Sequence, residues 1–222
     1  KNNGTLYNNT QVCGGIDACP LWVDGKIGKA ISFDGVDDYV GILHSESLAM
    51  YDNFTVTAWF KVSDYADYRV IISRWETHPK NFYLGVWYND GRLAFYQTDR
   101  NGVHYSAFSS SAVGTNVMRF ATAVKRGSSL EVWLDGELVG TGTGVTGEPS
   151  VVSVTHVGHN SGTNVGTQHF KGVIDEVRIY NKPLSQEEIF SHYLQPLSIK
   201  IFPPQQINLI SFEKLNALRN IS

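Results

Sequence analysis

The chain has 222 residues, of which 42% are hydrophobic, 12% aromatic and 18% charged, an ordinary globular composition that suits one β-sandwich domain. Its net charge of −3, with no long run of lysine or arginine, gives no electrostatic reason to bind nucleic acid. No hydrophobic stretch reaches the roughly 20 residues needed to cross a bilayer, so we expect no membrane span in this chain.

Two cysteines stand six positions apart near the start of the chain. Cys13 and Cys19 flank the pair Gly14-Gly15, which lets a short loop close, so the simplest prediction is a local disulfide. The alternative is two unpaired thiols in a cytosolic protein, because disulfides persist in oxidising compartments. A disulfide therefore predicts an extracellular or cell-surface location.

Two further features bear on the compartment. The polar start of the chain does not resemble a signal peptide, so we expect upstream residues in the natural protein. Four Asn-x-Ser/Thr sequons are glycosylation sites if the chain is secreted, although chance alone supplies several in such a sequence. They begin at Asn3, Asn8, Asn53 and Asn220.

From Phe54 onward, apolar residues recur at every second position between closely spaced turn pairs such as Asp90-Gly91 and Asp135-Gly136. This is the pattern of antiparallel hairpins, and it predicts about eleven to fourteen strands in two packed sheets. Within 54–62, one face carries only apolar residues and the other Thr55, Thr57, Trp59 and Lys61, as in a strand covered on one side.

One short helix is predicted after Pro183. Ser185 and Glu188 have the spacing of a capping box, and Ile189 follows on the predicted apolar face. Beyond Pro196 the character of the sequence changes. We therefore divide the chain into a domain at 1–195 and an extension at 196–222.

Several segments, in the same order along the chain, resemble the laminin-G-like branch of the concanavalin A-like lectin/glucanase superfamily. The similarity implies an all-β fold: a two-sheet antiparallel β-sandwich of the jelly-roll type with one short C-terminal helix. The segments that carry the resemblance are 28–40, 54–59, 132–138, 172–181 and 183–189.

The chain departs from this family at its start. The family begins with an apolar, acidic strand ahead of a segment like 3–8, and that strand is absent here. A sheet that lacks a strand exposes an edge that invites pairing with another chain or with a distant part of the same one. Residues 198–202 or 207–212 are candidate donors, so we predict self-association through this edge and 197–222.

A buried acid is expected in the closing strand. Strict alternation places Asp175 on one face with Val173, Val177 and Ile179, where a carboxylate needs a metal or several hydrogen-bond donors. The resemblance implies a structural calcium held by Asp175 and by acids of the turn 34–38. The candidate ligands are Asp34, Asp37, Asp38 and Asp175. The alternative is that Asp175 accepts backbone N–H bonds and Asp34 caps its turn.

Catalysis is not expected. The glucanases of the superfamily carry a Glu-x-Asp-x-x-Glu strand, which this sequence lacks. The nearest acids, Glu131, Asp135 and Glu137, straddle a hairpin turn and are interpreted as exposed polar residues. His156 and His159, three positions apart, would lie on opposite faces of a strand and are not predicted to form a metal site.

Aromatic side chains are frequent and offer flat surfaces for sugar rings. The resemblance makes Trp59 a packing residue, whereas Trp75, between Arg74 and Glu76, is expected in a loop open to a ligand. The candidate ligand-binding residues are Trp75, Trp87, Tyr88 and Tyr105.

These observations lead to three functional hypotheses. The first is a calcium-stabilised carbohydrate-binding or adhesion module of the lectin type, outside the cell, with a glycan or a cell-surface protein as partner. The second is a structural subunit of a surface filament or complex assembled by strand donation. The third is a glycoside hydrolase.

Overall fold

The computed structural model describes residues 3–14, 19–48, 50, 52–75, 82–99, 101–144, 146, 153–160 and 168–195. The strands, in chain order, are β1 (Gly4–Asn8), β2 (Gln11–Val12), β3 (Leu21–Asp24), β4 (Lys29–Asp34), β5 (Asp38–Ile42), β6 (Asn53–Val62), β7 (Arg69–Arg74), β8 (Phe82–Val86), β9 (Arg92–Thr98), β10 (His104–Ala112), β11 (Arg119–Arg126), β12 (Ser129–Leu134), β13 (Glu137–Thr143), β14 (Thr155–Val157) and β15 (Lys171–Tyr180). A 3-10 turn, η1 (Glu46–Leu48), and one helix, α1 (Gln186–Leu194), complete the fold.

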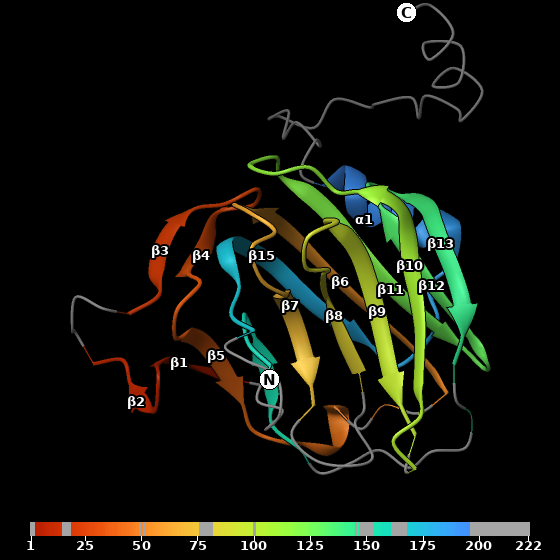
Figure 1. The fold of residues 1–222 in the computed structure, drawn as a ribbon, viewed down its shortest axis with the longest axis horizontal. Helices are drawn as coiled ribbons and strands as arrows, with labels where there is room; N and C mark the ends of the chain where they lie inside the picture. The colour runs from red at the N-terminus through yellow and green to blue at the C-terminus, as the bar shows by residue number, and fades with distance from the viewer. Residues whose placement is uncertain are drawn as a thin grey trace, which may run out of the picture.

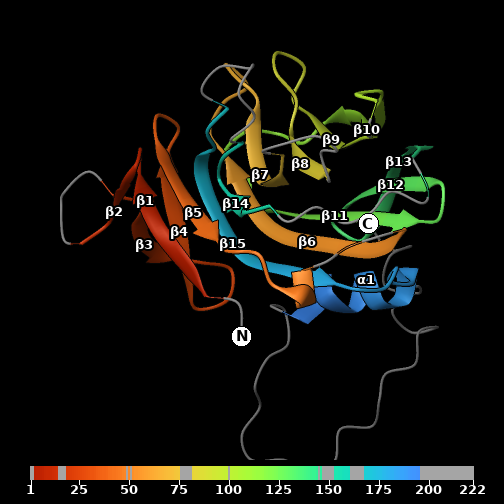
Figure 2. The ribbon, with the colours of Figure 1, turned by 90° about the horizontal axis from the view of Figure 1, so that it is seen from below.

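The strands form two packed antiparallel sheets, as predicted (Figure 1). The eight-stranded sheet has the order β10-β9-β8-β7-β14-β5-β1-β2, and the seven-stranded sheet has the order β13-β12-β11-β6-β15-β4-β3. Figure 2 shows α1 on the side of the seven-stranded sheet that faces away from the other sheet. The predicted all-β sandwich with one short helix is confirmed.

The core lies between the two sheets and is built from alternate residues. Phe54, Val56 and Phe60 of β6 point inward, opposite Phe82 and Phe95 of the other sheet, and all are fully buried. The ring centroids of Phe54 and Phe82 are 5.5 Å apart. The inward face predicted for 54–62 is therefore correct.

The outward face of β6 is also buried, which the sequence pattern did not predict. Thr55, Thr57 and Trp59 are at most 3% exposed. Leu184, just before α1, and Ile189, in α1, pack against this face together with Trp59. The helix thus converts a strand that alternates like a half-exposed one into a strand buried on both sides.

The helix begins where the capping box predicts. The Ser185 side chain accepts a hydrogen bond from the Glu188 backbone N–H, and the Glu188 carboxylate accepts one from the Ser185 N–H. These two bonds satisfy backbone donors that the first helical turn leaves unpaired. No helix in the described part of the chain is long and apolar enough to cross a membrane.

A β-bulge in β15 overturns the predicted alternation of the closing strand. The pairing of β15 with β6 shifts between Asp175 and Arg178, and Glu176 has a left-handed φ of 49°. Before the bulge Ile174 faces the core, and after it Val177 and Ile179 do. Because a bulge adds one residue to one strand, Asp175 does not share a face with Val177 and Ile179 as expected.

The two flanks of the sandwich differ. On one flank β13 of one sheet approaches β10 of the other so closely that a Cβ at Gly142 would lie 1.8 Å from the Ser106 carbonyl oxygen. On the other flank β4 pairs with β15 only as far as Ile174. Within the described residues, no strand pairs with that edge of β15 beyond this point.

Candidate functional site

The outward face of the eight-stranded sheet carries a group of aromatic rings. Tyr83 of β8 stands directly opposite Tyr96 of β9, and Ser106 of β10 stands opposite Tyr96 on its other side. Alternate positions point the same way, so Trp87, just beyond β8, and Phe108 of β10 join this face. The three strands therefore collect aromatic residues that lie far apart in sequence.

We call a group of five residues on this face the aromatic platform. They are Tyr68, Trp87, Tyr88, Tyr96 and Phe108. The rings of Trp87 and Tyr96 are stacked, with centroids 5.2 Å apart and planes 7° from parallel. Tyr68 and Phe108 each meet Trp87 edge-on, at 4.6 and 5.2 Å. Tyr88 is 41% exposed and the other four are partly buried, so each of the five residues keeps some contact with solvent.

A buried cluster adjoins the platform on the same face of the sheet. Val70, Trp75, Tyr83 and Ala94 pack together, and Trp87, Tyr96 and Phe108 pack against them. Tyr83 lies over Gly85, where a Cβ would come within 2.7 Å of the Tyr83 hydroxyl oxygen, so only glycine leaves room for this ring. The Tyr83 hydroxyl has no hydrogen-bond partner among the described residues, and burial raises its pKa.

The predicted ligand-binding residues fall into two groups. Trp87 and Tyr88 belong to the platform. Trp75 is only 6% exposed and packs against Tyr83, so the expectation of an open loop residue is wrong, because the ring folds onto the sheet. Tyr105 packs against the core between the sheets, since odd positions of β10 point inward. Neither residue is available on the platform.

Sequence reasoning missed Phe108 altogether. Its position in a period-two stretch places it on a face with Ser106, but only strand pairing brings it to Trp87 and Tyr96. It also missed Trp22, which lies in the edge strand β3 and is 63% exposed. The signal for Trp22 was its place in the short segment before Asp24-Gly25, which resembles an edge strand closed by a turn.

Charged groups border the platform. The Arg92 guanidinium lies over the Phe108 ring, 4.6 Å from its centroid. Its Nε donates to the Asp90 carboxylate at 2.7 Å, and both side chains are about 40% exposed. An aromatic surface with hydrogen-bonding groups at its rim has the two components that bind sugars: flat rings for C–H faces and polar atoms for hydroxyl groups.

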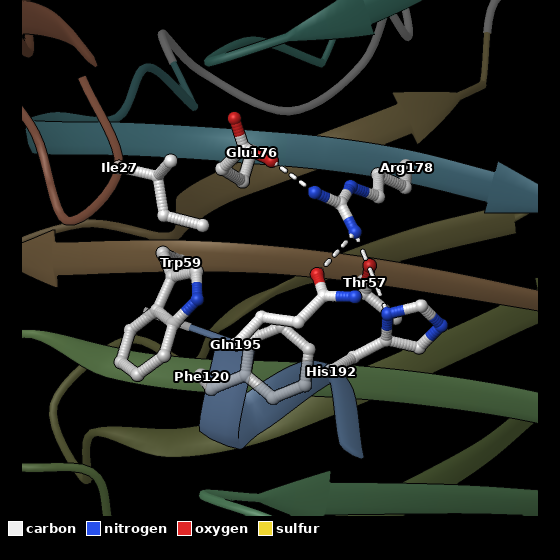
Figure 3. A pocket seen from close by; sticks show the side chains of 8 residues that line it. All are labelled: Ile27, Thr57, Trp59, Phe120, Glu176, Arg178, His192 and Gln195. Carbon is white, nitrogen blue, oxygen red and sulfur yellow. Dashed lines mark hydrogen bonds and ion pairs between the residues drawn. The ribbon is translucent and has the colours of Figure 1, made fainter. Parts of the chain in front are cut away.

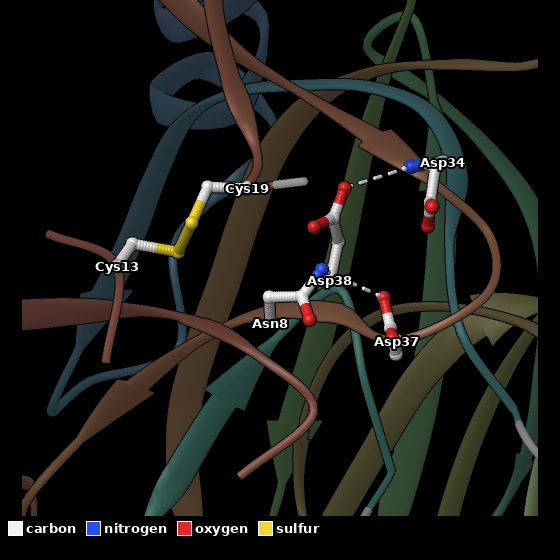
Figure 4. The surroundings of a disulfide bond; sticks show 6 residues. All are labelled: Asn8, Cys13, Cys19, Asp34, Asp37 and Asp38. Atoms are coloured by element: carbon white, nitrogen blue, oxygen red, sulfur yellow. Dashed lines mark hydrogen bonds between the residues drawn. A yellow bond between two sulfur atoms is a disulfide. The ribbon is translucent and has the colours of Figure 1, made fainter. Parts of the chain in front are cut away.

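A second candidate site is an acidic cluster at the turn between β4 and β5 (Figure 4). Oxygen atoms of Asp34, Asp37 and Asp38 lie within 4.8 Å of one another. Asp38 Oδ2 accepts a hydrogen bond from the Asp34 N–H at 3.1 Å, and Asn8 Nδ2 donates to Asp37 Oδ1 at 3.2 Å. Three of the four predicted metal ligands are therefore brought together.

Asp38 has the most buried carboxylate of this cluster. The residue is 3% exposed, and its Oδ1 is buried with no hydrogen-bond partner among the described residues. Burial, together with the charges of Asp34 and Asp37, raises the pKa of Asp38 to about 6. A buried carboxylate oxygen beside two other acids fits a hard cation such as calcium, which is bound by several oxygens.

Asp175 is not part of this cluster. Its Oδ2 accepts hydrogen bonds from the backbone N–H groups of Lys26 at 2.7 Å and Ile27 at 3.0 Å. Gly25 lets this turn approach, because a Cβ there would lie 2.4 Å from the same oxygen. The residue is 5% exposed, so the alternative interpretation, a buried acid satisfied by backbone donors, describes Asp175.

The predicted disulfide between Cys13 and Cys19 is confirmed, with a Cα–Cα distance of 5.9 Å. Figure 4 shows it close to the strand segment that carries Asn8. Asn3 and Asn53 are exposed, whereas Asn8 is half-buried and uses its Nδ2 for Asp37. Asn220 lies outside the described residues, as do the candidate donor segments 198–202 and 207–212.

The acids near the β12–β13 turn are held by neighbouring groups. Glu131 accepts from the Trp133 indole N–H at 3.0 Å, and Asp135 accepts from the Phe120 N–H at 2.7 Å. Asp135 also pairs with Arg119 at 2.8 Å. Glu131 and Asp135 are half-buried rather than exposed as expected, and only Glu137 is exposed, because the first two reach back over the sheet.

A small cavity lies between β6, β15 and α1 (Figure 3). Arg178 crosses it, contacting Glu176 and donating to Gln195 Oε1 at 3.0 Å. Trp59 forms part of the wall and is 3% exposed, which confirms its expected packing role. With a volume of about 10 Å³, the cavity has room for one water molecule and for no organic ligand.

His156 and His159 lie close together, contrary to the expectation of opposite faces. Their ring centroids are 5.6 Å apart, because β14 ends at Val157 and Gly158, with φ of 82°, turns the chain back. His159 also stacks on His169 at 4.3 Å. Burial, and then the neighbouring His169 and His156, lower the pKa of His159 to about 3.

Comparison with known proteins supports this architecture. Residues 34–190 match the family model described as the concanavalin A-like lectin/glucanases superfamily. No curated protein matches the chain.

Solved structures share the fold at low sequence identity. One is domain 4 of AbnA, an extracellular GH43 arabinanase from Geobacillus stearothermophilus, in complex with arabinotriose. It has 21% identity and a TM-score of 0.65, over 85% of this chain and 86% of that domain.

Others are receptor-binding domains of botulinum neurotoxins. The mosaic serotype C/D domain has 17% identity and a TM-score of 0.63, and the serotype G domain has 14% identity and a TM-score of 0.63. The matches cover 85% and 86% of this chain but only 49% and 46% of those domains. This chain thus spans about half the length of the toxin domains that it matches.

Proposed function

This chain belongs to the concanavalin A-like lectin/glucanase superfamily, and from that premise we propose that it is a carbohydrate-binding module that holds a glycan on the aromatic platform. The observation that carries the proposal is the stacked pair of Trp87 and Tyr96, flanked by Tyr68 and Phe108 on the open face of the eight-stranded sheet. Sugar C–H groups pack on the negative faces of such rings.

The ligand class follows from the surroundings of the platform. Arg92 is paired with Asp90, so the rim carries balanced charge and offers both donors and acceptors for hydroxyl groups. A neutral glycan suits this rim better than a polyanion. Arabinotriose bound to the arabinanase domain with the same fold shows that such a fold accommodates an oligosaccharide.

The proposed role is binding without catalysis. Retaining glycosidases need two carboxyl groups about 5 to 5.5 Å apart beside the scissile bond. On the platform, Asp90 is occupied by Arg92, and the acids at the β12–β13 turn belong to the other sheet. We therefore assign the platform to retention of a glycan and not to hydrolysis.

We assign calcium a structural role at the acidic cluster. Asp34, Asp37 and Asp38 would hold the ion, and bound calcium would offset two of the three negative charges that these carboxylates carry. The cluster ties β1 to β5 through the Asn8–Asp37 hydrogen bond, so an ion there would stabilise this edge of the sheet. Asp175 has no part in this proposal.

The proposed location is outside the cell or on its surface. The Cys13–Cys19 disulfide needs an oxidising compartment, and the arabinanase of the similar domain is an extracellular enzyme. The proposed partner is a glycan or a glycosylated surface protein.

Native gel electrophoresis through soluble polysaccharides tests the glycan hypothesis. We expect wild-type protein to be retarded in at least one gel of a panel containing arabinan, xylan, galactomannan and β-glucan. Trp87→Ala and Tyr96→Ala should migrate as in a gel without polysaccharide, while Leu138→Arg, at an exposed site on the other sheet, should be retarded like wild type. No retardation of the wild type in any gel would refute the proposal.

A second candidate function, assembly by strand exchange, has one observation in its favour. β15 has one edge paired with β6 and the other paired with β4. The β4-side edge lacks a described partner strand from Asp175 to Tyr180, and Val177 and Ile179 in this stretch are only partly buried. The proposed occupant is a segment of 197–222 from a second copy of the chain. Light scattering should then show a dimer or larger assembly for 1–222 and a monomer for 1–195; monomers in both cases would remove this function.

A further inference from the structure

A groove lies on the same face of the eight-stranded sheet, some distance from the platform, where β1, β5 and β14 meet. Its volume is about 420 Å³, which is in the range of small-molecule sites. It is lined by Asn3, Thr5, Tyr7, Tyr39, Gly41, Leu43, Val154 and His156. None of these side chains is acidic, and none is lysine or arginine.

Two tyrosines form the wall of the groove. Tyr7 of β1 and Tyr39 of β5 are cross-strand partners, and their rings are stacked 4.8 Å apart with planes 7° from parallel. Both are partly buried and keep an open portion toward the groove. His156 of β14 meets Tyr39 edge-on at 5.4 Å and stands opposite Gly41.

Gly41 keeps the floor of the groove low. A Cβ at this position would lie 3.0 Å from Tyr7 Cε2 and 3.7 Å from Tyr39 Cε2, which would push against the tyrosine pair. The absence of a side chain therefore creates the depression beside the two rings. Thr5 and Asn3 at its rim are exposed and supply hydrogen-bonding groups.

The groove and the platform belong to one surface. Tyr39 is on β5 and Tyr96 is on β9, and β14, β7 and β8 lie between them in the sheet. Four strand spacings of about 4.8 Å separate the two tyrosines by roughly 19 Å. A single sugar ring cannot touch both sites, whereas an extended oligosaccharide can.

We propose that the Tyr7–Tyr39–His156 groove is a second sugar subsite, so that the module binds an extended, neutral glycan chain across the eight-stranded sheet rather than a single terminal sugar. This inference rests on the proposed function, because it places one end of the chain on the platform. The neutral lining of the groove and its stacked tyrosines carry the assignment of ligand class.

Affinity for ligands of two lengths tests the subsite. The probes are the polysaccharide that retards the wild type and the trisaccharide cut from it, measured by calorimetry with the full chain. Thr5→Arg, which fills the rim of the groove from an exposed position, and Tyr39→Ala should each weaken polysaccharide binding by about fivefold or more. Both should leave trisaccharide binding at the platform within about twofold of wild type.

The controls separate this inference from the proposed function. Trp87→Ala should weaken both ligands, and Leu138→Arg neither. Thr5→Arg should unfold at the wild-type temperature, so it remains informative if Tyr39→Ala folds poorly. Wild-type affinity of Thr5→Arg for the polysaccharide, with Trp87→Ala impaired, would overturn the second subsite and leave the platform standing. A wild type that binds no polysaccharide would overturn both.

Discussion

The two outer faces of the sandwich carry similar aromatic residues but differ in what covers them. On the seven-stranded sheet, Trp59, Phe120 and Trp133 lie beneath α1, and each is at most 7% exposed. On the eight-stranded sheet, Trp87, Tyr96 and Phe108 form the platform and remain partly exposed to solvent. The same residue types thus serve packing on one face and are available for recognition on the other.

The helix accounts for this difference. Tyr193 of α1 stacks on Trp59 with ring centroids 5.6 Å apart, so the apolar face of the helix covers the aromatic surface of this sheet. No helix of the described chain lies on the other face, as Figure 2 shows. An aromatic surface that stays open in a folded protein is a candidate binding site.

The largest expected effect is on the covered face. Trp59→Ala should lower the free energy of unfolding by about 3–5 kcal/mol, because it opens a cavity under α1 and removes the contact with Tyr193. Urea denaturation measures this loss. A change below about 1 kcal/mol would show that α1 does not seal this face.

Calcium should act at the edge of the open face. At a concentration one hundred times its dissociation constant, calcium should stabilise the protein by about 2.7 kcal/mol, as measured by thermal or urea unfolding. Asp38→Asn should abolish this increment. The matched control is Asp24→Asn, whose side chain is 90% exposed and pairs with Lys29; it should retain the increment. An equal response of both variants to calcium would place the ion elsewhere.

On the open face itself, Trp87→Ala should cost about 1–2 kcal/mol of stability, since it removes ring contacts with Tyr68 and Tyr96 but no fully buried core residue. The same variant should lose polysaccharide retention. Trp59→Ala, at a temperature where it stays folded, should keep it. Retention lost by Trp59→Ala and kept by Trp87→Ala would reverse the roles assigned to the two faces.

An effect confined to low pH concerns His159, which lies next to His156 of the groove. Its folded-state pKa of about 3 is below the ordinary value of 6.5, so between these values the unfolded chain binds a proton that the folded chain does not. Stability contributed by neutral His159 is therefore lost as pH falls from 6.5 toward 3. The difference between the urea midpoints at about pH 7 and about pH 4.5 should be smaller for His159→Gln than for wild type. The same difference in both proteins would contradict this.

Local patterns were sufficient for much of the fold. Alternation in 54–62 gave the inward face correctly, since the pleat of one strand places alternate residues on one side. The capping box at Ser185 and Glu188 placed the start of α1, because the cap acts within one turn. The six-residue spacing of Cys13 and Cys19 was enough for the disulfide.

The predictions failed where a bulge or a turn interrupts the alternation of side chains along a strand. The bulge at Glu176 moved Asp175 away from the expected face, and the turn at Gly158 brought His159 back to His156. Trp75 was expected to be open to solvent but lies folded against Tyr83. An alternating pattern defines a face only while the strand is unbroken.

The sequence by itself determined that this chain folds into two antiparallel sheets with a capped helix and a short disulfide loop, because each of these depends on residues close together along the chain. Only the tertiary structure decided which aromatic residues face solvent, that three aspartates meet without Asp175, and that Tyr7 meets Tyr39 beside Gly41. These features arise from strand pairing and helix packing between distant segments, which no local pattern encodes.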